Sequence, residues 1–233
     1  MESLAQELLN AIIDHMPPEH LHSCSLVARR WREWSQQRYF RVIAFYDTAV
    51  DRWYENIPQD PDGIPSYVRN VKFHDTWEWN DPSVFGSVLK RFRHLKTLEL
   101  SDILVPYEEV VDLVSSGEFG REIISLTIFA PQESALPALM SLVLSLPNLT
   151  ELMIDGISAV AVGLPPSPLP EKTWQREPLQ SLKLYWIGGC EVDFITRCGI
   201  MSRMVDMRVS EEMIEKIVAC SSATMSKLVL RGT

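Results

Sequence analysis

The sequence predicts an α/β protein in which an N-terminal module of three helices precedes a solenoid built on a parallel sheet of about seven strands. Three observations support this fold class. A short apolar pattern recurs along most of the chain, segments with helical spacing lie between its copies, and the first part of the chain lacks the pattern. We therefore expect a helical module over residues 1–45, a connecting segment over 46–67 and the solenoid over 68–233.

The repeated pattern consists of an apolar residue, two variable residues, an apolar residue, a variable residue and an apolar residue. It occurs seven times, with copies that start at residues 68, 95, 123, 149, 179, 204 and 225. Successive starts lie 21 to 30 residues apart, in or next to the period of about 20–29 residues that leucine-rich repeats have. The Asn or Cys that often follows the strand in that repeat is missing, so the region is leucine-rich-repeat-like.

Segments between the copies predict helices outside the sheet. Apolar residues recur at helical spacing within residues 84–92, 110–114, 139–146 and 213–218. The return segment after the fourth copy is different, because five prolines between residues 165 and 178 exclude a regular helix there and predict an extended loop. A doubly wound α/β domain would need longer units and a glycine-rich first turn, and the sequence has neither.

The first 43 residues read as three helices. Leu4, Leu8, Ile12 and Met16 form an apolar stripe at helical spacing, and Leu9 and Ile13 flank it. Pro17 and Pro18 end this helix and begin a second one. A third helix is expected over residues 29–40.

This segment, SLAQELLNAIIDHMPPEHLHSCSLVARRWREWSQQRYFRVI, resembles the F-box motif, especially as fungal proteins with leucine-rich repeats carry it. The matching features are Leu4, Glu7, Leu8, Ile12, Pro17, Leu21, Val27, Arg30 and Trp31. Ala5 stands where the family usually has proline, and Ala28 stands where it often has cysteine. The family binds a Skp-family adaptor of a ubiquitin ligase through helix faces.

The resemblance therefore implies an adaptor-binding set, which consists of Leu4, Glu7, Leu8, Ile12, Leu21, Val27, Arg30 and Trp31. The alternative for Leu8, Ile12 and Val27 is that they form the core of the module itself. Core packing is the favoured interpretation for Trp31.

Composition restricts the remaining function classes. The 233 residues carry a formal charge of −9, which disfavours nucleic acid and anionic membrane as partners. Four cysteines without a C-x-x-C pair predict a reduced protein, located in the cytoplasm and/or the nucleus. The most apolar run, residues 136–146, is too short for a membrane span of about 20 residues.

Signatures of enzymes and cofactors are missing from the sequence. It contains no G-x-S-x-G, no G-x-x-x-x-G-K and no G-x-G-x-x-G, so that we expect no enzymatic activity and no cofactor. His15, His20 and His22 straddle a Pro-Pro break without a partner at a metal-ligand spacing, and we interpret them as solvated turn histidines. Asp60 and Asp62 before Gly63 indicate a turn rather than a calcium loop, and no metal site is predicted.

The outward positions of the strands predict a binding surface, because in such arrays they form the concave face. The candidate substrate-binding residues are Phe129, Met153, Lys183, Tyr185 and Arg208. Phe129, Met153 and Tyr185, with Trp186 beside the last, are expected to form an apolar centre rimmed by charge. The alternative is that they tuck under neighbouring loops.

These observations predict the substrate receptor of an SCF-type cullin ubiquitin ligase, in which the F-box binds the adaptor and the repeats bind a protein substrate of unspecified identity. The alternatives are a non-catalytic interaction scaffold without a ligase role and an enzyme with a dispersed site. The sequence ends at Thr233, directly after the seventh copy, so we expect the last strand to be an exposed edge.

Overall fold

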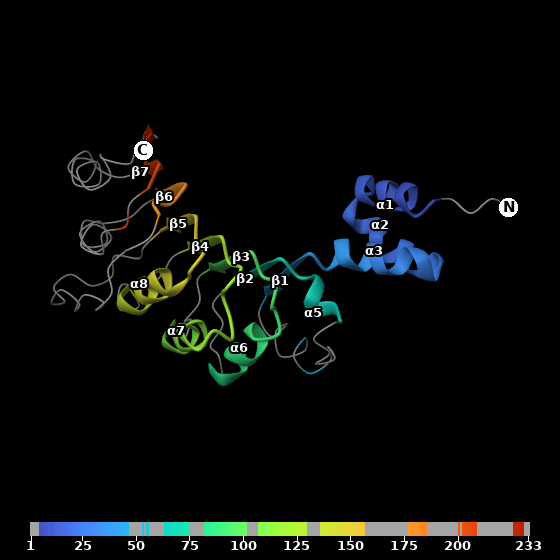
Figure 1. The fold of residues 1–233 in the computed structure, drawn as a ribbon, viewed down its shortest axis with the longest axis horizontal. Helices are drawn as coiled ribbons and strands as arrows, with labels where there is room; N and C mark the ends of the chain where they lie inside the picture. Colours follow the sequence, from blue (N-terminus) through green and yellow to red (C-terminus); the bar gives the residue numbers. More distant parts are fainter. Residues whose placement is uncertain are drawn as a thin grey trace.

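The structure of the protein is a computed structural model, which describes residues 5–46, 53, 55, 63–74, 82–101, 107–129, 136–156, 177–185, 200, 202–208 and 226–230. Within these residues, three helices form one end, and a parallel sheet with helices on one face forms the larger part (Figure 1). The predicted combination of N-terminal helices with a parallel α/β sheet is confirmed.

The helical module consists of α1 (Gln6–His15), α2 (Pro18–Val27) and α3 (Arg29–Tyr39). Pro17 and Pro18 separate the first two helices, as predicted. Pro18 occupies the first turn of α2, and proline is tolerated there because an N–H group in the first turn has no hydrogen-bond acceptor within the helix. Leu9, Ile13, Leu21 and Cys24 form the buried interior.

Two polar contacts fix α3 against the end of α1. The Trp34 Nε1–H group donates to Asp14 Oδ1 at 3.0 Å. The Arg38 guanidinium donates to the main-chain oxygen of Ile13.

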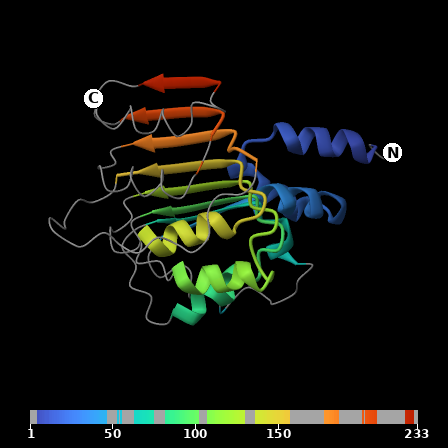
Figure 2. The same cartoon turned by 60° about the vertical axis from the view of Figure 1, so that its left-hand side comes forward.

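Eight parallel strands follow one another in chain order across a single sheet (Figure 2). They are β1 (Val42–Tyr46), β2 (Asn70–His74), β3 (Thr97–Ser101), β4 (Ser125–Phe129), β5 (Glu151–Asp155), β6 (Ser181–Tyr185), β7 (Met204–Arg208) and β8 (Lys227–Leu230). β2 to β8 correspond to the seven predicted strands. β1 is an additional strand, which begins three residues after α3 ends.

The sixth copy of the pattern was predicted in the wrong register. Val205 of β7 pairs with Leu182, and Ser202 forms a bridge with Leu179. The copy therefore starts at Ser202 and not at Met204. Ser202 is fully buried, although it is polar, because its hydroxyl donates to the main-chain oxygen of Leu179.

Helices α6 (Pro82–Leu89), α7 (Tyr107–Ser115) and α8 (Leu136–Ser145) cover one face of the sheet (Figures 1 and 2). In β2 to β6, alternate apolar side chains point to this face and are at most 1% exposed. This core consists of two rows, one from Val71 through Leu98, Leu126, Leu152 and Leu182 and one from Phe73 through Leu100, Ile128, Ile154 and Leu184. The predicted helix at 213–218 and the proline loop at 165–178, apart from its last residue, lie outside the described residues.

Aromatic rings fill the core at the end of the sheet nearest the helical module. Phe45 of β1 stacks on Phe73 with centroids 5.1 Å apart, and Trp53 lies edge-on to Phe45 at 5.6 Å. Phe85 and Phe92 complete the cluster. These rings join β1 to the rest of the sheet, so that the strand directly after α3 is anchored in the same core as its neighbours.

A regular hydrogen-bond pattern joins the strands where they begin. The main-chain oxygen of Arg41 accepts from the amides of Arg69 at 2.9 Å and Asn70 at 3.0 Å. The oxygens of Arg69, Lys96, Ile124, Thr150 and Arg203 each accept two amides of the next strand in the same way. The starts of the strands are thus aligned along one edge of the sheet.

Candidate functional site

Helix α1 has an outward apolar face beside a shallow groove. Leu8 is 55% exposed and Ile12 is 44% exposed. Both line a groove of about 800 Å³ together with Ala11, His15, Met16, Pro17 and His20. An exposed apolar groove of this kind is typical of a surface that another protein covers.

The same helix also has an inward apolar face. Leu9 and Ile13 follow Leu8 and Ile12 directly in the sequence and are both fully buried. The stripe that the sequence shows is therefore two stripes, of which one builds the module and the other faces solvent. Leu8 and Ile12 therefore do not belong to the core of the module, which was the alternative interpretation, because their side chains are exposed to solvent.

A second exposed apolar site lies at the end of α2, where Val27 is 68% exposed and its neighbour Leu26 is 69% exposed. The sequence did not lead us to predict Leu26 as an adaptor contact, although the apolar pair Leu26 and Val27 at the end of a helix could have indicated it. The Gln6 side chain donates to the main-chain oxygen of Arg30 at 3.4 Å, which brings the beginnings of α1 and α3 together. Val27 and Arg30 consequently lie near the first turn of α1.

The remaining adaptor candidates differ in position. Glu7 and Arg30 are exposed, and Trp31 is half-buried. Leu21 is only 1% exposed and belongs to the interior of the module. Leu4 lies outside the described residues.

The face of the sheet opposite α6, α7 and α8 carries the candidate substrate residues. We call it the open face, and it comprises alternate strand residues beginning with Asn70, Thr97, Ser125, Glu151, Ser181 and Met204. One row across it runs through Phe129, Asp155, Tyr185 and Arg208, and the next runs through Thr127, Met153, Lys183 and Asp206. All five predicted residues therefore have positions on this face, and those with described side chains are half-buried.

The predicted apolar centre is interrupted by a carboxylate. Asp155 lies between Phe129 and Tyr185 in the pairing of β4, β5 and β6. The Tyr185 hydroxyl donates to Asp206 Oδ2 at 2.9 Å, and Asp206 is 5% exposed. This part of the open face thus combines two rings and a thioether with acidic groups. Trp186 lies outside the described residues.

The other half of the open face contains a small cluster of charged and aromatic side chains. Glu99 Oε2 forms an ion pair with Lys72 Nζ at 2.7 Å, and Glu99 Oε1 lies 3.6 Å from His74 Nε2. The His74 ring stacks on Tyr46 with centroids 5.1 Å apart.

In the described ranges, no group of three His, Cys, Asp or Glu side chains is arranged to hold a metal ion. Among the helices that the structure describes, none has the length and apolar character needed to cross a membrane.

Comparison with known proteins identifies the helical module. The family model of the F-box domain matches residues 1–43. No curated protein matches the chain. F-box domains bind Skp-type adaptors, and proteins that carry them are in general adaptors within ubiquitin ligases rather than enzymes. An F-box domain therefore occupies the end of the chain at which Leu8 and Ile12 are exposed.

Proposed function

We propose, from the F-box domain at residues 1–43, that the chain is a substrate receptor of an SCF-type cullin ubiquitin ligase. Residues 1–45 bind a Skp-family adaptor, and residues 68–233, a leucine-rich-repeat-like solenoid, bind a protein substrate on the open face. The observation that carries the proposal is the exposed apolar face of α1 within a matched F-box domain.

Exposed apolar side chains on α1 and α2 support the proposed adaptor surface, because apolar groups in contact with water are unfavourable in free energy. Leu8 and Ile12 on α1 and Leu26 and Val27 on α2 are all between 44% and 69% exposed. Covering apolar surface contributes about 25 cal/mol per Å². A partner that buries these side chains gains this free energy, and Glu7 and Arg30 at the margin supply polar contacts.

The pairing of the strands supports a solenoid. Eight parallel strands follow in chain order, with short helices on one side, and each unit contacts only its neighbours in the sheet. Such an array leaves one long face of the sheet for a partner. Phe129, Met153, Lys183, Tyr185 and Arg208 are the proposed contacts on it.

The proposed contribution to ubiquitin transfer is positional. A receptor that holds the substrate on one end and the adaptor on the other raises the local concentration of substrate near the transferring enzyme. It needs no catalytic group or cofactor of its own. We place this activity in the cytoplasm and/or the nucleus.

The proposal is tested by measuring the affinity of the purified chain for a Skp-type adaptor, with Leu8→Asp as the variant. The new carboxylate would have to lose its hydration in the interface without a partner. We expect the affinity to fall by about tenfold or more, which corresponds to 1.4 kcal/mol or more. Folding should be retained, because Leu8 is exposed in the free chain.

The matched control is Ile124→Asp, because Ile124 is 43% exposed but precedes β4, far from the F-box domain in the chain. This variant should bind the adaptor as the wild type does. If the wild-type chain does not bind a Skp-type adaptor at all, the ligase role is wrong and the non-catalytic scaffold becomes the better hypothesis.

A further inference from the structure

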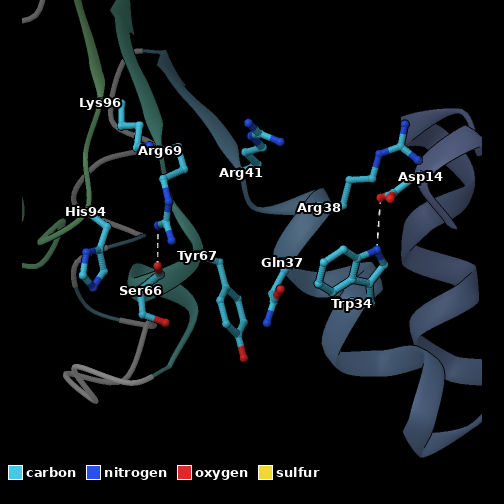
Figure 3. Close-up of a pocket in the computed structure, with 10 residues that line it drawn as sticks. All are labelled: Asp14, Trp34, Gln37, Arg38, Arg41, Ser66, Tyr67, Arg69, His94 and Lys96. Carbon is cyan, nitrogen blue, oxygen red and sulfur yellow. Dashed lines mark hydrogen bonds between the residues drawn. The ribbon is translucent and has the colours of Figure 1, made fainter. Parts of the chain in front are cut away.

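A basic cleft lies between the F-box domain and the first strands of the sheet. It has a volume of about 870 Å³ and receives side chains from both sides (Figure 3). Arg38 comes from α3, Arg41 precedes β1, Arg69 precedes β2, and Lys96 precedes β3. Four cations thus line one cleft in a protein whose formal charge is −9.

Among the residues that the structure describes, no carboxylate pairs with these four cations. Arg69 donates to the main-chain oxygens of Ser66 and Val68, and Arg38 donates to that of Ile13. Such bonds satisfy N–H donors but leave the positive charge in place.

The sheet itself holds three of the cations together. Arg41, Arg69 and Lys96 occupy the same position in three successive strands, since each of their main-chain oxygens accepts the two amides that start the next strand. Neighbouring strands in a sheet lie about 4.8 Å apart. The three positive side chains therefore start from neighbouring positions at one edge of the sheet and line the same cleft, although they point in different directions (Figure 3), and an anion between them would lower their mutual repulsion.

One acidic residue, Asp14, also lines the cleft, and it keeps its negative charge. Asp14 lies on the opposite wall and accepts from Trp34 Nε1 at 3.0 Å. His94 lies at the margin with its ring 3.0 Å from Glu122. In Figure 3, Tyr67, Gln37 and Arg41 lie in the middle of the cleft, with Arg69 and Lys96 on the side of the sheet and Arg38 on the side of α3.

We propose that this cleft binds a small soluble molecule that carries two or more adjacent phosphate groups. Guanidinium groups bind phosphate oxygens through paired hydrogen bonds, and an ammonium group adds a further positive charge. Four cations distributed over the walls of one cleft match the several charges of linked phosphates better than they match a single carboxylate. The volume lies within the range of about 300–1,000 Å³ that small-molecule sites have.

A ligand in this position would bridge the F-box domain and the sheet. Arg38 belongs to the last turn of α3, while Arg69 and Lys96 belong to the strand edge. A bound oligophosphate contacts both sides at once, so that it fixes the direction in which the sheet leaves the F-box domain. This inference goes beyond the proposed ligase role and does not depend on adaptor or substrate binding.

The test uses the full chain and inorganic tripolyphosphate in a calorimetric titration. Arg41→Glu with Lys96→Glu is the informative variant, since both side chains are exposed and form no ion pair or side-chain hydrogen bond in the described residues. We expect the double variant to bind at least tenfold more weakly. The matched control reverses two exposed cations outside the cleft, Arg32→Glu with Arg93→Glu, and should keep the wild-type affinity.

Two further ligands separate this proposal from its alternatives. Citrate, a tricarboxylate, should bind at least tenfold more weakly than tripolyphosphate, and equal affinities would mean a general attraction of anions and overturn the phosphate site. A doubly phosphorylated ten-residue peptide should also bind more weakly than tripolyphosphate. Binding of the peptide alone, or equal loss of tripolyphosphate affinity in the control variant, would overturn the proposal.

Discussion

The hydroxyl of Ser202 donates a hydrogen bond of 3.2 Å to the main-chain oxygen of Leu179 on the neighbouring strand. Ser202 is fully buried at the position that carries an apolar side chain in β2 to β6. The bond lets a polar residue occupy an apolar position of the repeat, because its only polar atom has a partner.

We expect Ser202→Ala to lower the free energy of unfolding by about 1 kcal/mol, the usual net contribution of a hydrogen bond. Urea denaturation measures this change. Ser226→Ala is the matched control, since its hydroxyl donates to the Arg203 oxygen at 2.8 Å but is exposed to water. If Ser226→Ala lowers the free energy of unfolding as much as Ser202→Ala does, burial does not determine how much such a hydrogen bond contributes to stability.

The two faces of α1 predict that substitutions of two adjacent leucines change the free energy of unfolding by very different amounts. Leu9→Ala should lower the free energy of unfolding of the F-box domain by about 2–5 kcal/mol, because it removes a fully buried side chain. Leu8→Ala should change it by less than about 0.5 kcal/mol, since Leu8 is exposed. Amide hydrogen exchange of α1 to α3 measures the stability of this domain, and equal losses would contradict the assignment of the faces.

The proposed substrate surface predicts a selective loss in Phe129→Ser with Tyr185→Ser. The proteins captured by proximity labelling in cells should decrease, while adaptor binding and helical content stay unchanged, because both side chains lie on the open face away from α6 to α8. Ile124→Ser is the control, as it removes an exposed apolar side chain outside this face. An unchanged set of captured proteins in the double variant would locate the substrate site elsewhere.

The turn after α7 predicts an asymmetry between two glycines. Gly120 has a φ of +84°, and an added Cβ would lie 2.8 Å from Leu146 Cδ2 and 3.0 Å from Val114 Cγ2. Gly120→Ala should therefore destabilise by about 1–3 kcal/mol through strain in the core. Gly117→Ala, with a φ of +75°, would meet only the mobile end of Arg121 and should cost about 1 kcal/mol from its backbone conformation. Thermal denaturation compares the two variants, and a larger loss at Gly117 would contradict this explanation.

The repeating pattern was sufficient to predict seven strands, but it missed β1. Phe40, Ile43 and Phe45 fit the pattern, with Phe45 buried in the core. This copy follows α3 without a glycine or proline to mark a boundary, so that its aromatic residues read as a continuation of the helix. The pattern alone could not separate the end of one element from the start of the next.

The register of β7 was missed for a different physical reason. Met204, Met207 and Val209 imitate the apolar pattern two residues away from the true start at Ser202. Sequence periodicity weighs side-chain polarity and cannot detect a hydrogen bond that satisfies a buried hydroxyl. Pairing with β6 selects the register instead.

The candidate sites were predictable only in part. Leu8 and Leu9 are both leucines in one stripe, and only the packing of α2 and α3 decides which of them is buried. The basic cleft had a signal in the sequence, since Arg41, Arg69 and Lys96 occupy the second position of three successive copies. This signal becomes visible only when the copy at β1 is recognised.

The aligned starts of the strands have an evolutionary consequence. Paired residues such as Ser125 and Glu151 are 26 positions apart in the chain, whereas Glu151 and Ser181 are 30 apart, yet both pairs keep the same alignment. The spacing of residues across the open face is set by hydrogen bonds between strands and is independent of the length of the returning segment. Insertions and deletions can accumulate in the returning segments over generations without moving the residues that meet a partner.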